Sequence, residues 1–463
     1  MKEADRDDKV PNAWEAADPT VCPECGRDAC DDHLPRGFTV LQGGRYRWKL
    51  PQYQTTFEAD RLHWDRNELG GELIVRCALA GVPLDPDDPS SALSWSTFNF
   101  TSATTRNTLA KRLEARSGTG KDKKNPVPWD DLVERFCQKV LTAERTGTPA
   151  VCLADVPDPP VDALFSVGGL QIPKCVPSMI FGDGDSLKST LALYLCGKLA
   201  QAGIPAAFFD WELNQAAQRK RYRQLFGQDL PRALIYCECS RAIVQEADRL
   251  TRIVGDRRIQ FGVFDSVVPA CGGKPEDAEM ASGYFRAVRN IGGPAFTSLH
   301  VAHITKADGG DQKPFGSVFW SNLVRQSWFV KAVDKEDGQP DQTISLGFYP
   351  RKHNLSGRGV AVGFDVTFSD GRITIESADV QQQGGELARM LPLWARIQTA
   401  LTTGPKTLAQ LTDELDAKLN SIEQAISRRR HTFVKITNSP DGKHRIGLVD
   451  RRYRNGSGPD KAD

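Results

Sequence analysis

Short apolar runs alternate with longer stretches of helical periodicity through the middle of the chain, from about residue 165 to residue 368. The apolar runs lie at residues 179–181, 206–209, 234–237, 261–264 and 298–302. Strands that are separated by helices in this way form βαβ units and pair in parallel. The pattern therefore predicts an α/β domain with a mainly parallel sheet, which we place at residues 161–378.

The region before this domain has a mixed pattern. Residues 38–41 and 72–75 alternate apolar and polar side chains as strands do, whereas residues 109–113 and 129–141 have helical periodicity. We therefore expect a small α+β domain at residues 37–155.

No motif assigns a role to this small domain. A loop rich in Gly and Lys at residues 117–126 is expected to be exposed, and a Pro-rich stretch at 156–160 marks the boundary with the next domain. Charged and aromatic side chains that suit contact with nucleic acid occur together at Arg61, His63, Trp64 and Arg66.

A last compact unit is expected at residues 386–452, after a Gln- and Gly-containing linker at 381–385. Its pattern predicts helices at 391–401, 407–415 and 421–430, followed by two strands around a turn at 439–442. This order is typical of a winged helix-turn-helix. Residues 453–463 are expected to form a disordered tail, and residues 1–36 form an acidic N-terminal segment.

Composition narrows the class of protein. The 463 residues are enough for several domains, and 60 Lys plus Arg against 59 Asp plus Glu leave no net attraction to nucleic acid, so any such contact must be local. The apolar runs are too short to cross a bilayer, and residues 1–19 contain no signal-peptide core. We expect a cytoplasmic protein without a membrane partner. Reduced, buried thiols are expected at Cys77, Cys137, Cys196 and Cys271, which stand singly in apolar stretches.

A glycine-bearing loop connects the strand-like run at 179–181 to a helical stretch at 191–200. The loop comprises Gly182, Asp183, Gly184, Asp185, Ser186, Leu187, Lys188, Ser189 and Thr190. This is the context of a Walker A motif, in which loop N–H groups and the helix N-terminus bind the phosphates of ATP. Lys188 would then contact the β- and γ-phosphates, and Ser189 would bind Mg²⁺. The alternative is an ordinary strand-to-helix turn with a serine cap.

Leu187 departs from the motif, because it stands where the second glycine is expected. If the loop holds this residue at positive φ, the leucine costs about 1–2 kcal/mol. A well-supported loop can tolerate that cost and still bind ATP, but the substitution puts hydrolysis in question.

Acidic residues follow two of the predicted strands. Asp265 ends the run at 261–264 at a distance from the loop that fits a Walker B acid, which holds Mg²⁺. Asp210 and Glu212 follow the run at 206–209. The alternatives are that Asp265 caps the next helix and that Asp210 and Glu212 are solvated loop acids.

Together, the P-loop and these acids resemble the RecA-like branch of P-loop ATPases, and particularly the RepA-type and DnaB-type replicative helicases. In that group a glutamate after the second strand activates the attacking water. The resemblance implies that Glu212 is the general base and that Asp210 is a supporting or alternative acid. It covers less than half of the chain.

Three further roles follow from the same resemblance. His303 lies at the expected carboxyl end of the strand at 298–302, where the family has a residue that senses the γ-phosphate. Arg325 and Lys352 match cations that reach a neighbouring subunit's nucleotide, with the register between Arg351 and Lys352 left open. These cations imply a homo-oligomer such as a hexamer. The alternatives are a core histidine and ordinary surface charges.

The ends of the chain carry two more candidate sites. The spacing of Cys22, Cys25, Cys30 and His33 suits a structural Zn²⁺ site and resembles a zinc knuckle, against the alternative of incidental clustering. In the C-terminal unit a basic cluster indicates DNA binding, although winged helices also dock proteins. The cluster comprises Arg428, Arg429, Arg430, His431, Lys443, His444, Arg445, Arg451, Arg452 and Arg454.

These features support two hypotheses. The first is an oligomeric, Mg²⁺-dependent ATPase that couples hydrolysis to work on DNA, as a replicative-helicase-like motor or loader. The second is a DNA-binding regulator or scaffold that binds ATP but scarcely hydrolyses it, because Leu187 alters the loop.

Overall fold

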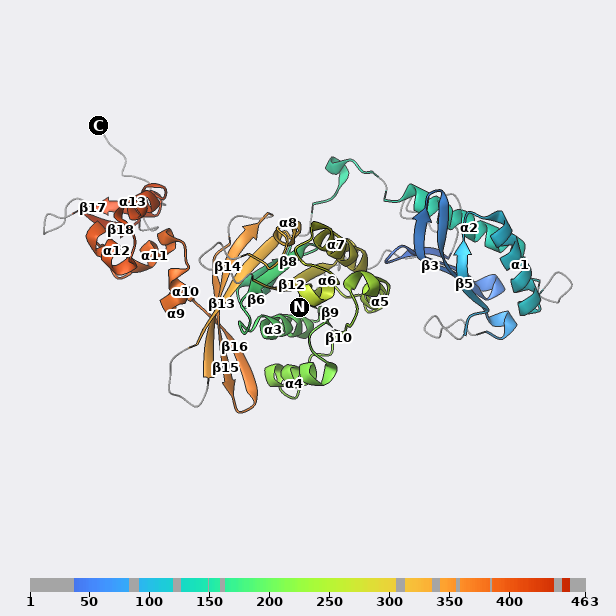
Figure 1. The fold of residues 1–463 in the computed structure, drawn as a ribbon, viewed down its shortest axis with the longest axis horizontal. Helices are drawn as coiled ribbons and strands as arrows, with labels where there is room; N and C mark the ends of the chain where they lie inside the picture. The colour runs from blue at the N-terminus through green and yellow to red at the C-terminus, as the bar shows by residue number, and fades with distance from the viewer. Residues whose placement is uncertain are drawn as a thin grey trace, which may run out of the picture. The chain divides into compact units, whose positions relative to one another are not determined.

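A computed structural model of the chain describes residues 37–82, 91–119, 126–148, 150–158, 163–304, 313–334, 342–354, 359–383, 385–436 and 444–449. The chain divides into two compact units, and the main boundary lies between Pro159 and Pro160 (Figure 1). Of the helices in the described ranges, none combines the length and the hydrophobicity that a membrane span requires.

The first unit contains an antiparallel sheet of five strands that pair in chain order. The strands are β1 (Phe38–Leu41), β2 (Arg45–Leu50), β3 (Thr55–Asp65), β4 (Glu68–Cys77) and β5 (Ser94–Asn99), and they are followed by α1 (Ala103–Ser117) and α2 (Trp129–Thr146). The ring of Phe136 on α2 lies 5.3 Å from that of Phe57 on β3 and stacks on Trp48 of β2. The amphipathic helix therefore covers the apolar face of the sheet.

The loop expected to be exposed at 117–126 is exposed at Gly118 and Pro126, but two of its described residues are buried. Ser117 and Thr119 are both buried, and both lie within hydrogen-bond distance of the Trp129 indole N–H, at 3.0 and 3.1 Å. A buried indole needs an acceptor, and these hydroxyls supply it.

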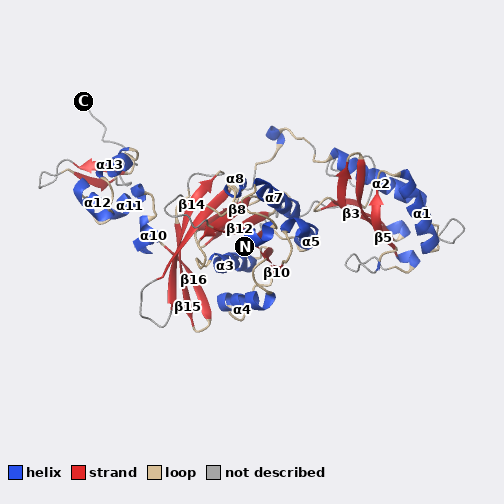
Figure 2. Cartoon of the chain, viewed as in Figure 1, coloured by secondary structure: helices blue, strands red, loops and turns tan. Residues whose placement is uncertain are grey.

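The second unit contains a sheet of nine strands in the order β10-β9-β11-β12-β8-β13-β14-β15-β16. The first six strands pair in parallel and the last three are antiparallel (Figure 2). The bounds are β8 (Pro177–Gly182), β9 (Ala206–Asp210), β10 (Leu234–Glu238), β11 (Phe261–Asp265), β12 (Thr297–His303), β13 (Gln326–Asp334), β14 (Gln342–His353), β15 (Val362–Ser369) and β16 (Arg372–Ala378). The expected mainly parallel sheet is confirmed, with an antiparallel extension.

Helices cover both faces of this sheet. The connecting helices are α3 (Lys188–Gln201), α4 (Gln215–Phe226), α5 (Ile243–Asp256), α6 (Val267–Cys271), α7 (Ala278–Gly292) and α8 (Phe319–Leu323), and a hairpin of β6 (Leu164–Val167) and β7 (Leu170–Pro173) precedes β8. Ile180 packs in one core cluster with Leu195 of α3, whereas on β12 the ring of His300 contacts Tyr284 and Phe285 of α7. Burial on both faces explains why the central strands are continuous apolar runs.

The C-terminal region contains three helices and a two-stranded sheet around one small core. The elements are α11 (Leu393–Ala400), α12 (Leu408–Leu415), α13 (Leu419–Ser427), β17 (Phe433–Ile436) and β18 (Arg445–Leu448). Two details differ from the expectation. The supposed linker forms two short helices, α9 (Val380–Gln383) and α10 (Gly385–Arg389), and α13 ends before the basic run that was expected on it. A run of cations just after a helix is favourable, because it faces the negative end of the helix dipole.

Candidate nucleotide-binding site

The loop that follows β8 has the shape of a phosphate-binding loop. Asp185 and Leu187 have positive φ angles of 56° and 53°, and α3 begins at Lys188 directly after Leu187. Gly182 allows β13 to approach closely, since a Cβ atom there would lie 2.3 Å from the carbonyl oxygen of Val330. The left-handed conformation foreseen for Leu187 is therefore present, without the glycine that usually provides it.

The Lys188 ammonium lies inside this loop. It is 4 % exposed and donates hydrogen bonds to the Gly182 carbonyl at 3.1 Å, to the Ser186 hydroxyl at 3.0 Å and to the Asp183 carbonyl. Burial lowers the pKa of Lys188 to about 8, against the opposing effect of the nearby Asp265. The loop thus holds a cation that its own carbonyls only partly compensate, at the place where a phosphate would be bound.

Asp265 meets the start of α3 from the end of β11. The Ser189 hydroxyl donates to Asp265 Oδ1 at 3.1 Å, and Asp265 is 2 % exposed. Burial raises the pKa of Asp265 to about 7, and the charge of Glu212 adds to the rise. The Ser189 hydroxyl and the buried Asp265 carboxylate form an oxygen donor set that fits Mg²⁺, which uses few protein ligands beside water and phosphate.

Glu212 lies at the open side of the same site. Its Oε1 accepts a hydrogen bond from the Ser266 hydroxyl and lies 3.8 Å from His303 Nε2. The neighbouring His303 lowers the pKa of Glu212 more than burial raises it, so the carboxylate is ionised near neutral pH. Because the side chain is 38 % exposed, it can receive a proton from a water molecule.

Asp210 does not have the same freedom. It is fully buried, and its Oδ1 accepts from the backbone N–H groups of Glu212 and Leu213 at 2.8 and 2.9 Å. Its Oδ2 accepts from Gln218 Nε2 at 2.8 Å and lies 3.2 Å from the Tyr236 hydroxyl, which is closer to the Leu213 carbonyl oxygen, at 2.7 Å. With both oxygens engaged and no route to water, Asp210 is a poor candidate for the alternative acid. It holds the turn that carries Glu212.

Parallel pairing explains why these residues meet. Gly182 is paired with His303, and Asp265 is paired with Val301 on one side and with Asp210 on the other. The carboxyl ends of four parallel strands therefore lie in one row, where open α/β sheets bind their ligands. The sequence placed Lys188, Ser189, Asp265, Glu212 and His303 at this edge, and the structure brings them together.

Arg325 and Lys352 lie at the opposite ends of these strands. The backbone N–H of Arg325 donates to the carbonyl of Pro177 at the start of β8. Lys352 is paired with Ser327 near the start of β13. Lys352 donates to the carbonyls of Ser321 and Asn322 at 2.9 and 2.8 Å and so caps α8. Arg325 is exposed. Neither cation belongs to the site around Lys188 of its own chain.

Sequence reasoning missed Ser266, Gln218 and Tyr236. Ser266 is the residue directly after Asp265, so its position beside the predicted magnesium ligand was a usable signal. Gln218 and Tyr236 act through Asp210, and no local pattern reveals a contact that depends on how α4 packs on the sheet.

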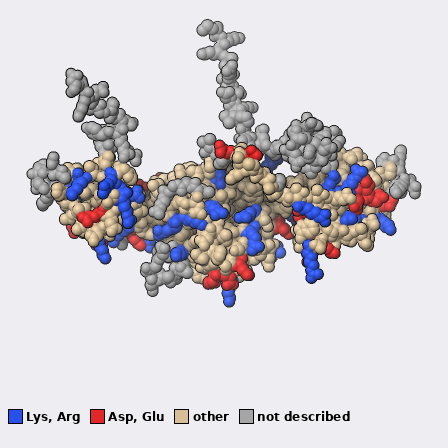
Figure 3. Space-filling view, turned by 90° about the horizontal axis from the view of Figure 1, so that it is seen from above, with Lys and Arg blue, Asp and Glu red and all other residues tan. Residues whose placement is uncertain are grey.

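The structure describes part of the C-terminal basic cluster but none of the predicted Zn²⁺ ligands. Cys22, Cys25, Cys30 and His33 lie outside the described residues, as do Lys443, Arg451, Arg452 and Arg454, so the Zn²⁺ site stays a prediction. Within the described ranges no group of three or more His, Cys, Asp or Glu side chains is arranged to hold a metal ion. In the C-terminal region the Arg429 guanidinium lies 3.9 Å from the Trp394 ring centroid. Arg428 and Arg430 are exposed, in a region where Figure 3 shows Lys and Arg side chains gathered at the left.

No protein-family model and no curated protein matches this sequence. Among solved structures, the chain is similar to a KaiC-like protein of the hyperthermophilic archaeon Pyrococcus horikoshii OT3, with 14% sequence identity and a TM-score of 0.36. The similarity covers 48% of this chain and 96% of that protein. A likeness of this degree is too weak to establish fold or function, which rest on the residues described above.

Proposed function

We propose that this chain is a RecA-like P-loop ATPase that binds Mg²⁺ and ATP at the Gly182–Thr190 loop and hydrolyses the γ-phosphate. The observation that carries the proposal is the convergence of Lys188, Ser189, Asp265 and Glu212 at the carboxyl edge of one parallel sheet. A structural turn with a serine cap would not need a buried lysine and a buried aspartate at the same place.

Each residue has a distinct task in this proposal. Lys188 and the loop N–H groups bind the phosphates, while Ser189 and Asp265 hold Mg²⁺, which offsets charge on the phosphate oxygens. Glu212 accepts the proton of the attacking water. His303 lies 3.8 Å from Glu212 and is suited to sense whether the γ-phosphate is present.

We further propose that the chain forms a homo-oligomer. Arg325 and Lys352 are too far from the P-loop of their own chain to act there, since β8 separates its two ends by about 16 Å at about 3.3 Å per residue. As in RepA-type and DnaB-type helicases, which the motifs resemble, these cations would complete the site of a neighbouring subunit. A ring such as a hexamer meets this requirement.

The C-terminal region is proposed to bind DNA as a winged helix-turn-helix. Its three helices and two strands follow the expected order, and Arg428 and Arg430 are exposed next to α13. Hydrolysis would then be coupled to DNA in a helicase-like motor or loader. A Zn²⁺ ion bound by Cys22, Cys25, Cys30 and His33 would fold the N-terminal segment.

The test is steady-state ATP hydrolysis with Mg²⁺, with and without single-stranded DNA. We expect turnover that DNA raises, that Lys188→Ala abolishes, and that Glu212→Gln lowers by about 100-fold, the lower range for loss of a general base. Glu376→Gln, which changes an exposed acid on β16, is the matched control and should retain full activity. Unchanged hydrolysis in Glu212→Gln would refute the assignment of the base.

A second candidate function follows from Leu187, whose φ of 53° shows a loop that departs from the usual glycine pattern. The chain would then bind ATP as a DNA-binding regulator or scaffold, with little hydrolysis. Tight binding of ATP without turnover, and no translocation along single-stranded DNA, would favour this function over the motor.

A further inference from the structure

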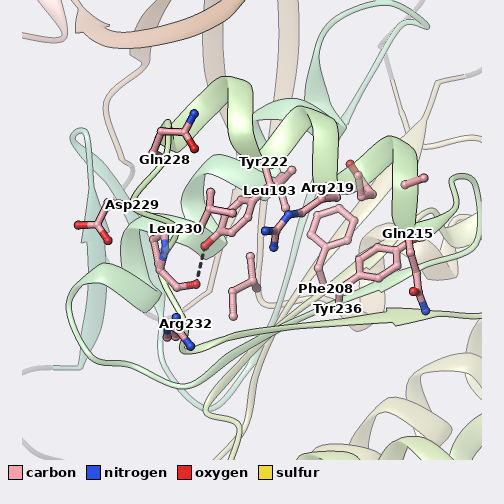
Figure 4. Close-up of a pocket in the computed structure, with 14 residues that line it drawn as sticks. Leu193, Phe208, Gln215, Arg219, Tyr222, Gln228, Asp229, Leu230, Arg232 and Tyr236 are labelled. Atoms are coloured by element: carbon pink, nitrogen blue, oxygen red, sulfur yellow. Dashed lines mark hydrogen bonds between the residues drawn. The ribbon is translucent and has the colours of Figure 1, made fainter.

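A cavity of about 1000 Å³ opens between α4 and the edge strand β10, away from the P-loop. One face of α4 lines it with Gln215, Gln218, Arg219 and Tyr222, whose spacing places them on the same side of the helix. Figure 4 labels Gln215, Arg219 and Tyr222 along this helix. Residues 228–232, β9, β10 and Leu193 of α3 supply the other walls. Its volume is at the upper end of the range of about 300–1,000 Å³ for pockets that hold small molecules.

Aromatic rings form the inner wall of this cavity. Phe208, Tyr222 and Tyr236 line it, and Phe208 is fully buried. The Tyr222 hydroxyl donates to the Pro231 carbonyl at 2.9 Å, which fixes the ring against the 228–232 segment. Burial raises the pKa values of Tyr222 and Tyr236, so both phenols are neutral at physiological pH. Such walls suit a planar ligand that stacks on rings.

Two arginines give the cavity a positive charge. Arg219 and Arg232 line it and are exposed, and among the described residues neither forms an ion pair. Figure 4 shows the Arg219 guanidinium beside the Tyr222 ring. Asp229 is the one acidic side chain among the lining residues, so the lining has a surplus of one positive charge. Unpaired arginines at an aromatic pocket suit a carboxylate or phosphate.

We propose that this cavity is a second ligand site, for a small molecule that carries a planar ring and one anionic group. Its rings would stack on Tyr222 and Tyr236, and its anion would pair with Arg219 and Arg232. The cavity lining reaches the turn after β9, because Gln218 Nε2 donates to Asp210 Oδ2, and the Tyr236 hydroxyl lies 3.2 Å from that oxygen and 2.7 Å from the Leu213 carbonyl oxygen. Asp210 in turn fixes the backbone N–H of Glu212. Occupancy therefore restrains the turn that carries the proposed base, a consequence that rests on the proposed ATPase function.

Binding is tested by calorimetry on the full chain carrying Lys188→Ala, which weakens the P-loop as a competing site. Adenosine monophosphate and salicylate are the probes. Adenosine tests the ring of the first probe without its anion, and inorganic phosphate tests the anion without the ring. We expect saturable binding of at least one probe at one site per chain, and much weaker binding of both halves. Arg219→Ala and Arg232→Ala should each lower affinity by about tenfold, as expected for a charge-assisted hydrogen bond.

Arg223→Ala is the matched control, because Arg223 is exposed on α4 and is absent from the cavity lining. It should leave probe affinity unchanged, and circular dichroism should show all variants folded. Absence of saturable binding by either probe, or equal losses in the Arg223 and Arg219 variants, would overturn the site.

Coupling is tested in the wild-type chain by following ATP turnover as the bound probe is added. We expect kcat to rise by about fivefold with little change in KM, within the usual range of allosteric coupling. Tyr236→Phe, which keeps the ring but removes the hydroxyl that contacts Asp210 and the Leu213 carbonyl, should still bind the probe and lose most of this activation. Probe binding without any change in kcat would overturn the coupling. A chain that binds the probe but never hydrolyses ATP would instead overturn the proposed function and leave the site standing.

Discussion

The Ser189 hydroxyl lies 3.1 Å from Asp265 Oδ1 across 76 residues of sequence, and this contact joins the start of α3 to the end of β11. Both groups are at the carboxyl edge of the sheet, one strand apart, because β12 lies between β8 and β11. The buried carboxylate is expensive to ionise without a cation, as its raised pKa of about 7 indicates. This cost is what the proposed Mg²⁺ ion would offset.

The pH dependence of nucleotide binding should show two limbs. Binding of Mg²⁺ and a non-hydrolysable ATP analogue needs ionised Asp265, whose pKa is about 7, and protonated Lys188, whose pKa is about 8. Affinity should therefore be highest between these values and fall by up to about tenfold per pH unit on either side. The measurement is the dissociation constant between about pH 5 and about pH 9. Without Mg²⁺ the part of the acidic limb due to Asp265 should disappear, and an acidic limb that survives intact would contradict the assignment.

Replacement of Asp265 by Asn should stabilise the nucleotide-free protein. The folded pKa of Asp265 is raised above the unfolded value, so this group makes the fold less stable as pH rises from about 4 to about 7. At pH 8 the unfolding free energy of Asp265→Asn should exceed that of the wild type by about 2–4 kcal/mol, from about 1.4 kcal/mol per pKa unit. The advantage should shrink steadily below pH 7 and be small near about pH 4. Chemical denaturation at several pH values measures it, and a difference independent of pH would rule out this origin.

Leu187 should show its backbone cost in a pair of substitutions. Leu187 is partly buried against the core, so both Leu187→Ala and Leu187→Gly lose packing. Only glycine relieves the φ of 53°, so Leu187→Gly should be more stable than Leu187→Ala by about 1 kcal/mol. The order should reverse at Lys198, an exposed position within α3, where alanine is favoured over glycine by about 1 kcal/mol. Denaturation midpoints of the four variants decide, and a more stable alanine at both positions would show that Leu187 is not strained.

Asp210→Asn should lower both stability and turnover. Asn has one carbonyl oxygen where Asp has two oxygens. Its amide group must either face the Gln218 amide and the Tyr236 hydroxyl or leave the backbone N–H of Glu212 without an acceptor, at a cost of about 1–3 kcal/mol. If Asp210 positions Glu212, kcat should fall while KM stays nearly constant. The double variant Asp210→Asn with Gln218→Glu gives the new amide an acceptor, so it should recover part of both losses. Stability that recovers without any return of kcat would limit Asp210 to a structural role.

Much of the fold was accessible from the sequence because β8, β9 and β11 are buried on both faces and appear as mostly apolar runs. The sheet of the first unit was harder to predict, since its strands bury charges as well as rings. Glu58 is 6 % exposed and pairs with Arg47 at 3.2 Å and with Arg76 at 3.8 Å. An ion pair of this kind removes the alternation of polar and apolar positions on which a strand prediction depends.

Some residues of the candidate site could be predicted from motif spacing, whereas others depend on contacts between distant segments. Motif spacing was enough to find Lys188, Ser189 and Asp265, because a P-loop and its partner acid are tied to the ends of strands. The preference for Glu212 over Asp210 came from the family resemblance. The residues alone could not supply it, because it depends on which carboxylate accepts the hydrogen bonds of the turn. The capping of α8 by Lys352 is likewise a contact between distant segments.

The position of Arg325 leads to a complementation test. Arg325 lies beside Pro177 at the start of β8, whereas Lys188 follows the end of that strand, so one chain cannot bring both to one nucleotide. If neighbouring subunits share sites, Lys188→Ala and Arg325→Ala should each abolish ATP turnover when alone. In mixed oligomers some interfaces combine the intact Lys188 of one subunit with the intact Arg325 of the next. Activity should therefore return to about one quarter of the wild-type value when the two variants mix randomly in equal amounts.

Mixing Lys188→Ala with Glu212→Gln is the control, because both defects lie on the same side of the interface and no intact site can form. Full activity of Arg325→Ala alone would remove this residue from the site, and equal recovery in both mixtures would show that the sites are not shared.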